Sequence, residues 1–533
     1  MASARLSHLR SPTDRKFWFL AALVAIAAAG IIIAMPMYHD HAIYWRGGER
    51  LRTGHLLSDD YLVKQPGIYV LFATSASLFG EHEWSYRAVD AIVQLCGAAL
   101  LSLVAFRIGG HRVAAFTSML YLTTYSANAY VLGSHPESYV GILLAALLLL
   151  RMSTTKSLWE RLAEAGIYSV LVMFKVTFGI IPLATFLWDI VSGWSQRRAL
   201  ARDWLAIAVS MLGTCAIIVA MLSRAIAWET IPDVVEYLRF YASLPPIHIA
   251  SALHAWHALL RVVSEQFTLL AVATALAGWL WMSQRTSQAL NVWALWTVAL
   301  AVSIVIERKF GIVHLWRMLP MLVLPAAIGL NDAWRSLQDV WKRGSFGVRV
   351  GYLIPLLCLA VVCSPLPRFV YSLRIPVLAA SNPDAYTRTF EQPAHNVLHR
   401  MTLWRIAGFI HAHRKPGDRV LVVSACMAQL PVFLGEPEWY HFATSLPILG
   451  ISVPTRWRTL FEQDVRRADW LVVSTLDRSE VLFGHRYSSW EALQQDTERM
   501  RYINEHFTLV METPIAIVLH RRTSHVSLSE LSQ

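Results

Sequence analysis

The sequence predicts an α-helical protein that crosses a membrane many times and carries a small α/β domain towards its C-terminal end. Its 533 residues are 55% hydrophobic and only 16% charged, with a mean hydropathy of +0.43, which is too apolar for an ordinary soluble globule. Several apolar runs are long enough to cross a bilayer, and they lack the alternation of barrel strands, so we expect spanning helices. From residue 418 onward, short apolar runs alternate with helical patterns, which is typical of an α/β unit.

The basic charge balance fits a membrane protein better than a nucleic-acid-binding one. The net charge is +11 and the isoelectric point is near 9.5. In polytopic proteins Arg and Lys gather in the cytoplasmic loops, and this accounts for the excess. We therefore expect membrane lipid, and no nucleic acid, among the partners.

The N-terminus reads as a retained signal-anchor helix. Basic residues, including Arg15 and Lys16, precede an apolar run that extends to about residue 35, and no small-residue cleavage site follows. The five cysteines form no CxxC motif and show no metal-ligand spacing, so we interpret them as small buried hydrophobes.

Taken in order, the apolar runs predict about eleven crossings, and the basic loops between them set the orientation. The first crossing starts from a basic, cytoplasmic end, so the polar loop 37–87 is expected outside. Inside this loop, residues 66–80 are apolar but short, and we expect an interfacial helix with Tyr69 and Phe72 at headgroup depth. The expected spans cover residues 17–36, 88–106, 113–132, 138–152, a hairpin of two short or bent helices over 162–192, 204–223, 263–282, 290–306, 318–331 and 350–366.

This topology divides the chain into a transmembrane domain, 1–366, with outer loops 37–87 and 224–262, and an extracytoplasmic α/β domain, 367–533. The strands expected in the second domain are RVLVVSA, WLVVST, FTLVME and IAIVLHR, the last two joined in a hairpin at Thr513 and Pro514, with a helix over 488–505. No GxGxxG motif follows the first strand, so a dinucleotide site is not expected.

Six ionisable residues are expected on the outer side, where burying charge at a membrane boundary is costly and often functional. They are Asp40, Lys64, Glu137, Lys175, His314 and Arg317. Carboxylates and cations that face one cavity suit a reaction in which a hydroxyl loses a proton while a phosphate leaves.

Each of these residues also has a purely structural interpretation. Asp40 suits the cap of a helix that begins near His41, and Lys64 suits an interfacial position with its ammonium in water. Glu137 follows Pro136 in a first helical turn, where the macrodipole favours a carboxylate. Lys175 and the two basic residues near 314–317 suit interfacial anchors.

A metal site is weakly indicated. His39 and His41 stand two residues apart, which is a poor spacing on a helix, and no Cys or further His follows nearby. We therefore expect no certain cofactor and leave a divalent metal as an open alternative.

A longer pattern runs through the first outer loop and continues at three later places. It comprises Asp40, Leu51, Gly54, Tyr61, Lys64, Pro66, Tyr69, Phe79, Gly80 and Arg87, then His135-Pro136-Glu137, Phe174-Lys175-Val176-Thr177, and Lys309, His314, Arg317 and Pro320. In order and topology it resembles the GT-C glycosyltransferases of the dolichyl-phosphate-mannose protein mannosyltransferase and ArnT-like group. Val63, Gln65 and His41 depart from the group's pattern, which argues against assignment to its aminoarabinose or protein O-mannosyl branches.

The resemblance implies an enzyme of the cell inner (plasma) membrane with its active site on the extracytoplasmic side. It implies inverting transfer of a sugar from a polyprenyl-phosphate donor to a lipid, glycan or protein acceptor. Asp40 would be the general base or would at least orient the acceptor hydroxyl, and Glu137 would organise the site. Lys64, Lys175, His314 and Arg317 would bind the donor phosphate.

Two other functions share this topology. A transporter or flippase of lipid-linked glycans would also have many helices with charge inside the membrane, but such proteins commonly show two similar halves, which this sequence lacks. A polymerase or ligase of lipid-linked glycans would differ in using a diphosphate donor.

Overall fold

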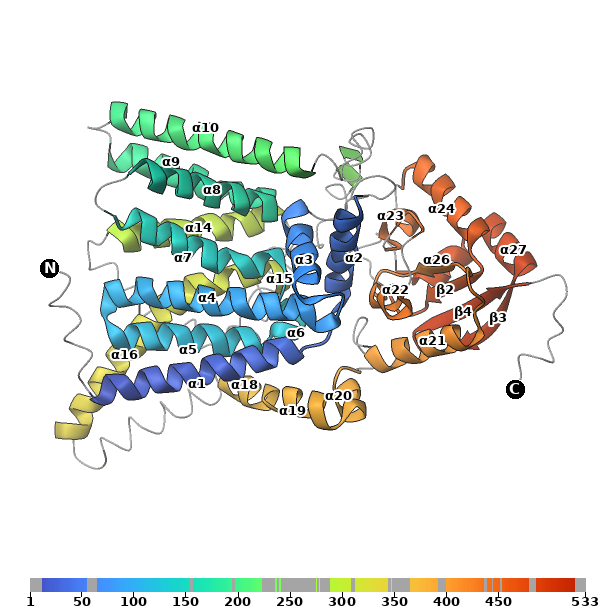
Figure 1. Ribbon diagram of the computed structural model, residues 1–533, viewed down its shortest axis with the longest axis horizontal. Helices are drawn as coiled ribbons and strands as arrows, with labels where there is room; N and C mark the ends of the chain where they lie inside the picture. Colours follow the sequence, from blue (N-terminus) through green and yellow to red (C-terminus); the bar gives the residue numbers. More distant parts are fainter. Residues whose placement is uncertain are drawn as a thin grey trace.

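A computed structural model shows a helical bundle joined to a mixed α/β domain (Figure 1). The described residues are 12–54, 65–153, 157–193, 197–222, 235–236, 239–240, 275, 278, 288–307, 312–343, 347, 365–391, 399–435, 439–442, 444–450, 453–478 and 486–522. The predicted spans over 263–282 and 350–366 and most of the outer loop 224–262 lie outside them, as does Lys64.

The helices of the bundle lie side by side in Figure 1 and pack around one apolar core. They are α1 (Pro12–Ala34), α4 (Glu83–Gly109), α5 (His111–Ala127), α7 (Val140–Arg151), α8 (Leu158–Phe174), α9 (Ile180–Ser192), α10 (Arg197–Leu222), α14 (Gln288–Glu307) and α16 (Leu319–Arg343). Within the described residues, five stretches are long and apolar enough to cross a membrane: Arg15–Ala34, Glu83–Gly109, Leu200–Ile218, Ala289–Glu307 and Val313–Lys342. The predicted class, a multi-pass helical membrane protein, is thereby confirmed.

The predicted hairpin over 162–192 is present. Helix α8 ends at Phe174, a 3₁₀ turn η3 (Val176–Gly179) follows, and α9 begins at Ile180. Arg151 bonds Glu164 near the start of α8 and Asp189 near the end of α9, so the two helices return to the same end of the bundle.

Helices α2 (His39–Thr53) and α3 (Pro66–Phe79) cross one end of the bundle (Figure 1). Gly47 and Gly48 let them approach closely, since a Cβ on Gly48 would lie only 2.8 Å from the backbone nitrogen of Ala73. The expectation that Tyr69 and Phe72 reach lipid headgroups is wrong. Both are buried in an apolar cluster with α2 and α4, because α3 turns that face towards the protein.

Three short helices lead from the bundle to the C-terminal domain: α18 (Leu366–Ser372), α19 (Arg374–Ser381) and α20 (Pro383–Thr389). Helix α18 packs on α5, and α19 packs along α1. The chain then enters α21 (Arg400–His413), which belongs to the α/β domain.

The C-terminal sheet has the strand order β1-β2-β4-β3. Its strands are β1 (Val420–Val423), β2 (Trp470–Ser474), β3 (Phe507–Glu512) and β4 (Ala516–Arg521). β1 and β2 are parallel, with Val422 opposite Val472, whereas β4 is antiparallel to both β2 and β3. The predicted hairpin between the last two strands is therefore confirmed.

Alternate side chains of the sheet face two layers of helices, as the pleat requires. Leu421 and Leu471 pack on the layer that contains α24 (Thr455–Arg467), whereas Val422 and Val472 pack on α21 and α22 (Gln429–Leu434). The predicted helix over 488–505 is interrupted: α26 (Ser489–Gln494) ends, and Asp496 caps α27 (Thr497–His506) by accepting a bond from the Arg499 N–H.

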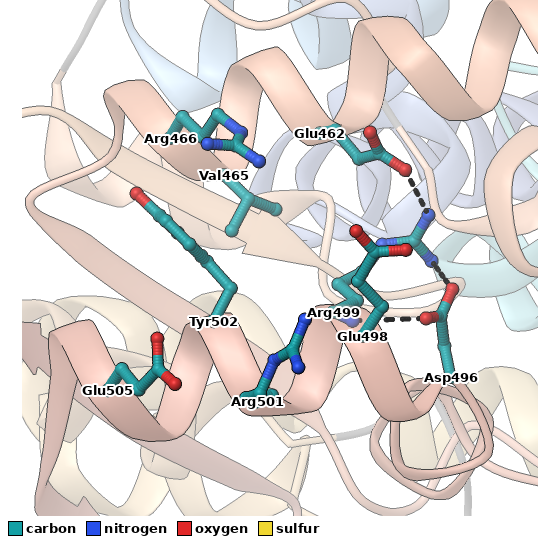
Figure 2. A pocket seen from close by; sticks show the side chains of 9 residues that line it. All are labelled: Glu462, Val465, Arg466, Asp496, Glu498, Arg499, Arg501, Tyr502 and Glu505. Carbon is teal, nitrogen blue, oxygen red and sulfur yellow. Dashed lines mark hydrogen bonds and ion pairs between the residues drawn. The ribbon is translucent and has the colours of Figure 1, made fainter.

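A charged pocket of about 180 Å³ lies between α24 and α27. Figure 2 shows the side chains that line it. Arg499 pairs there with Glu462 at 3.5 Å and with Asp496 at 3.1 Å. Helix α27 lies on the side of the domain away from the bundle (Figure 1), so this pocket is separate from the polar cluster described next.

Candidate functional site

Four of the six residues predicted for the site meet in one ionic cluster, which we call the Glu137 network. It consists of Glu137, Lys175, Glu307, His314 and Arg317. Its members come from segments far apart in the sequence, at points where regular helices begin, end or are interrupted.

Lys175 lies at the centre of this network. Its Nζ is 2.6 Å from Glu137 Oε1, 2.8 Å from Glu307 Oε2 and 2.9 Å from His314 Nδ1. The lysine caps the C-terminal end of α8 with an extended backbone, φ −162° and ψ 123°, which turns the chain out of the helix. His314 Nδ1 is also 3.0 Å from Glu137 Oε1, so this nitrogen can accept from Lys175 or, when protonated, donate to Glu137.

Arg317 bonds both carboxylates of the network, those of Glu137 and Glu307. Its Nη1 donates to Glu307 Oε1 at 2.8 Å and its Nη2 to Glu137 Oε1 at 3.2 Å, and Ser303 Oγ accepts a further bond at 2.6 Å. The guanidinium also lies over the ring of Phe178. Arg317 is fully buried, so its present position serves the carboxylates rather than an incoming ligand.

The accessible groups of the network are an ammonium and an imidazole. The side chains of Lys175 and His314 are 14% and 21% exposed, whereas Glu137, Glu307 and Arg317 are buried. An anion that approaches this surface would therefore meet the ammonium and the imidazole first.

Glu137 is held in its ionised form. Burial alone would raise the pKa of its carboxyl, but Lys175, His314 and Arg317 outweigh burial and hold the pKa well below the ordinary value of 4.5. A carboxylate of this kind organises cations and is a poor proton acceptor at neutral pH.

The turn that carries Glu137, residues 133–139, is fixed by a buried polar group on α4. Ser134 has φ of 59°, a left-handed conformation that no other non-glycine residue adopts within the described parts of the chain. Asp90 accepts a bond from Ser134 Oγ at 2.9 Å, and its two oxygens share the single proton of the Tyr125 hydroxyl. That hydroxyl accepts in turn from the Ser134 N–H. These bonds offset the strain at Ser134 and fix the turn before Glu137.

Asp40 lies beside the same turn, in the first turn of α2. Its Oδ2 is 3.9 Å from Nδ1 of His135, two residues before Glu137, and its side chain is 27% exposed. The helix begins at His39 with Tyr38 as the N-cap, so Asp40 does not cap it as the structural interpretation proposed. Among the three carboxylates described here, that of Asp40 is accessible, whereas those of Glu137 and Glu307 are buried.

His41 is a structural residue. Its Nε2 lies 2.6 Å from the Gly133 carbonyl and must donate to it, so Nδ1 is the acceptor for the Tyr38 N–H. Burial first, and then the nearby Arg87 guanidinium, hold the pKa of His41 well below its ordinary value. His39 Nδ1 accepts from the Ala428 N–H, so the two histidines do not converge on a shared ion.

A different group could hold a divalent cation. Glu137, Glu307 and His314 offer ligand atoms within 4.8 Å of one another. The Lys175 ammonium, however, already bonds all three groups, so a cation would fit only after Lys175 had moved away.

Glu307 was not among the predicted site residues. It is the last residue of α14, and it bonds Lys175, Arg317 and the Thr177 hydroxyl. A carboxylate at the end of an apolar span was a signal present in the sequence, since such a charge needs a nearby cation.

The structure is similar to two kinds of solved membrane enzyme. It matches ArnT from Cupriavidus metallidurans bound to undecaprenyl phosphate with a TM-score of 0.61 and 16% identity, covering 96% of this chain and 99% of that one. It matches AglB, the oligosaccharyltransferase of Archaeoglobus fulgidus, in complex with an inhibitory peptide and a dolichol-phosphate, with a TM-score of 0.51 and 12% identity over 86% and 69% of the chains.

The same ArnT in its apo state gives a TM-score of 0.59 at 16% identity, covering 94% of this chain and 97% of that one. No protein-family model and no curated protein matches the sequence. The chain therefore has the GT-C, ArnT-like fold, and the fold that the sequence resemblance implied is confirmed.

Proposed function

We propose that this protein is a membrane glycosyltransferase that moves a sugar from a polyprenyl-phosphate donor to an acceptor hydroxyl with inversion. The reaction would take place on the extracytoplasmic side of the inner (plasma) membrane, and the acceptor would be a lipid, a glycan or a protein. The fold supports this class, because the ArnT structure contains undecaprenyl phosphate and the AglB structure contains a dolichol-phosphate.

The observation that carries the proposal is a partly exposed cationic surface next to exposed apolar side chains. Val176 follows Lys175 directly, and Val305 and Ile306 precede Glu307; all three are exposed. A polyprenyl phosphate has the same two parts, an anionic head and an apolar tail. Lys175 and His314 would receive the head, and the apolar ends of η3 and α14 would meet the tail.

The network is built so that Lys175 can change partner. When the ammonium turns to a phosphate, Arg317 still bonds both Glu137 and Glu307, so neither carboxylate is left buried without a cation. Lys175 would then neutralise the charge that develops on the leaving phosphate, and His314 would offer that phosphate a hydrogen bond. Lys64, which lies outside the described residues, is proposed as a further phosphate ligand.

Asp40 is proposed as the base. In a single displacement the acceptor oxygen bonds the anomeric carbon as the bond from that carbon to the phosphate oxygen breaks, and the acceptor proton passes to Asp40. Polyprenyl phosphate leaves, and the configuration inverts. Asp40 suits this role because its carboxylate is accessible, whereas the other two carboxylates are buried against cations.

The test uses purified protein and a panel of undecaprenyl-phosphate monosaccharides, with release of undecaprenyl phosphate as the readout. Asp40→Asn should lower turnover by about 10²–10⁴-fold, because the amide cannot take the proton. Glu81→Gln is the matched control, since Glu81 forms an exposed pair with Arg52 on the same side of the protein. Near-normal turnover in Asp40→Asn would remove Asp40 from the mechanism.

The donor can be identified independently in cells. A strain that lacks the protein should accumulate one polyprenyl-linked monosaccharide, which mass spectrometry of the lipid extract would detect. In reconstituted vesicles, movement of an intact lipid-linked glycan across the membrane without release of polyprenyl phosphate would instead favour a transporter.

A further inference from the structure

The segment that leads into Asp40 has no regular secondary structure, and side chains of α4 hydrogen-bond its backbone. This α1–α2 linker, residues 35–38, connects the end of α1 to the first residue of α2. The Pro36 carbonyl accepts from Arg87 Nη2 at 2.8 Å, and the Met37 N–H donates to Glu83 Oε1. Both partners lie at the start of α4.

Glu83 is in turn held by the start of the C-terminal domain. Arg400 Nη1 and Nη2 donate to its two carboxylate oxygens at 2.6 and 2.7 Å, a bidentate pair. The Arg400 side chain is buried among three aromatic rings, those of Tyr386, Trp404 and Phe433, at 5.8, 6.0 and 5.4 Å. The guanidinium is thus fixed by residues of α20, α21 and α22 together.

Two further contacts from the same part of the chain bracket the linker. The Tyr386 hydroxyl donates to the Ala34 carbonyl at 2.9 Å, just before the linker. The Ala428 N–H donates to His39 Nδ1 at 3.2 Å, just after it and next to Asp40. The region after residue 366 therefore contacts the backbone or side chains on both sides of the linker and, through Glu83, its centre.

We infer that Glu83 and Arg400 are positioning residues, and that docking of the C-terminal domain through this pair sets where Asp40 lies. Neither residue contacts a member of the Glu137 network in the interactions described above, so their effect on transfer would act through the Met37 N–H and the linker. This inference rests on the proposed role of Asp40 as base. Through the Glu83–Arg400 pair, Asp40 would be correctly placed only when the C-terminal domain is docked on the bundle.

The alternative is that the pair merely holds two domains together, and two variants separate these interpretations. Arg400→Met removes the guanidinium, keeps an apolar chain among the rings and leaves Glu83 without its partner. Glu83→Gln combined with Arg400→Met removes both charges, yet the new amide oxygen at position 83 can still accept the Met37 N–H. Arg400→Lys keeps the charge but makes fewer bonds.

The first readout is hydrogen exchange of the amides at 37–43 in the full-length protein, measured by mass spectrometry of its peptides. Arg400→Met should speed this exchange by about tenfold or more. A tenfold change corresponds to about 1.4 kcal/mol, which is the size of one hydrogen bond or ion pair lost from the docked domain. The double variant should return close to wild type, and Arg400→Lys should fall between. Glu81→Gln, at the exposed Arg52 pair, should leave exchange unchanged.

The second readout is steady-state release of undecaprenyl phosphate from undecaprenyl-phosphate monosaccharides. Arg400→Met should lower kcat in step with the exchange and leave KM for the donor unchanged, because the phosphate ligands are not touched. Slow exchange in β1 and β2 should persist in every variant and report that the C-terminal domain is folded. If Arg400→Met unfolds the domain, Arg400→Lys and the double variant carry the test.

The possible failures can be told apart. Unchanged exchange at 37–43 in Arg400→Met, with strands β1 and β2 intact, overturns the positioning role whatever the activity. Equal loss of kcat in Arg400→Met and the double variant, despite recovered exchange in the latter, also overturns it. A wild type that releases no undecaprenyl phosphate from any donor overturns the proposed function, while the exchange data still report on the pair.

Discussion

Two buried ionic networks lie at opposite ends of α7, and they differ in where their residues sit. Glu137 precedes α7, and Arg151 is its last residue, so about 18 Å of helix separates the two ends. Arg151 bonds both Glu164 and Asp189. The Tyr168 hydroxyl donates to Glu164 at 3.0 Å, and the Trp204 indole N–H donates to Asp189 at 3.1 Å. We call these five residues the Arg151 network.

The Arg151 network joins regular helices, whereas the Glu137 network joins turns and helix ends. All three charged groups of the Arg151 network are largely buried, and one guanidinium serves two carboxylates. In the Glu137 network two carboxylates are shared by Lys175, Arg317 and His314, and the ammonium and imidazole reach the surface. The first arrangement holds helices together; in the second, the proposed function requires that Lys175 be released to a ligand.

The largest expected effect is on stability, from Arg151→Met. This change leaves Glu164 and Asp189 without their guanidinium and should lower the free energy of unfolding by about 3–5 kcal/mol. Thermal unfolding in detergent measures it. The triple variant Arg151→Met, Glu164→Gln, Asp189→Asn should regain much of the loss, and a triple variant no more stable than the single one would show that charge is not the cause.

Lys175→Met should act on catalysis more than on stability. Loss of the ammonium should lower turnover with undecaprenyl-phosphate monosaccharides by about 10²–10³-fold, as for other groups that stabilise developing charge. Its melting temperature should fall less than that of Arg151→Met, because Arg317 still bonds both carboxylates. Lys342→Met is the matched control, because Lys342 is exposed at the end of α16. A larger loss of stability than in Arg151→Met would reverse the assignment of the two networks.

The smallest effect concerns pH. The folded-state pKa of Glu137 lies below the ordinary value of 4.5, so its stabilisation is fully present above that pH and is lost as the pH falls through the lowered pKa. The free energy of unfolding of wild type should therefore exceed that of Glu137→Gln by a constant amount, about 1.5–3 kcal/mol, from pH 8 to about 5. Melting curves at lower pH should show the margin shrinking; a margin that already changes between pH 8 and 6 would contradict the ionised state.

The sequence predicted site residues best where leaving an ionisable group without a partner would cost the most free energy. Glu137, Lys175, His314 and Arg317 stand at the ends of apolar runs, where an ionisable group needs a partner, and the structure brings all four together. Glu307 stands at the end of an apolar run in the same way, but it was not among the predicted site residues. Tyr69 and Phe72 show the opposite limit, since an aromatic pattern looks the same whether it faces lipid headgroups or a neighbouring helix.

The sequence by itself determined the multi-pass class, the helical hairpin that places Lys175 at its turn, and the strands of the C-terminal domain. Those features follow from the length, polarity and period of local segments. Only the tertiary structure decided which carboxylates are buried and which is accessible, and that residues 386, 400 and 428 contact Ala34, Glu83 and His39 around the linker before Asp40. These contacts join positions more than 300 residues apart, and no local pattern encodes a pairing of that separation.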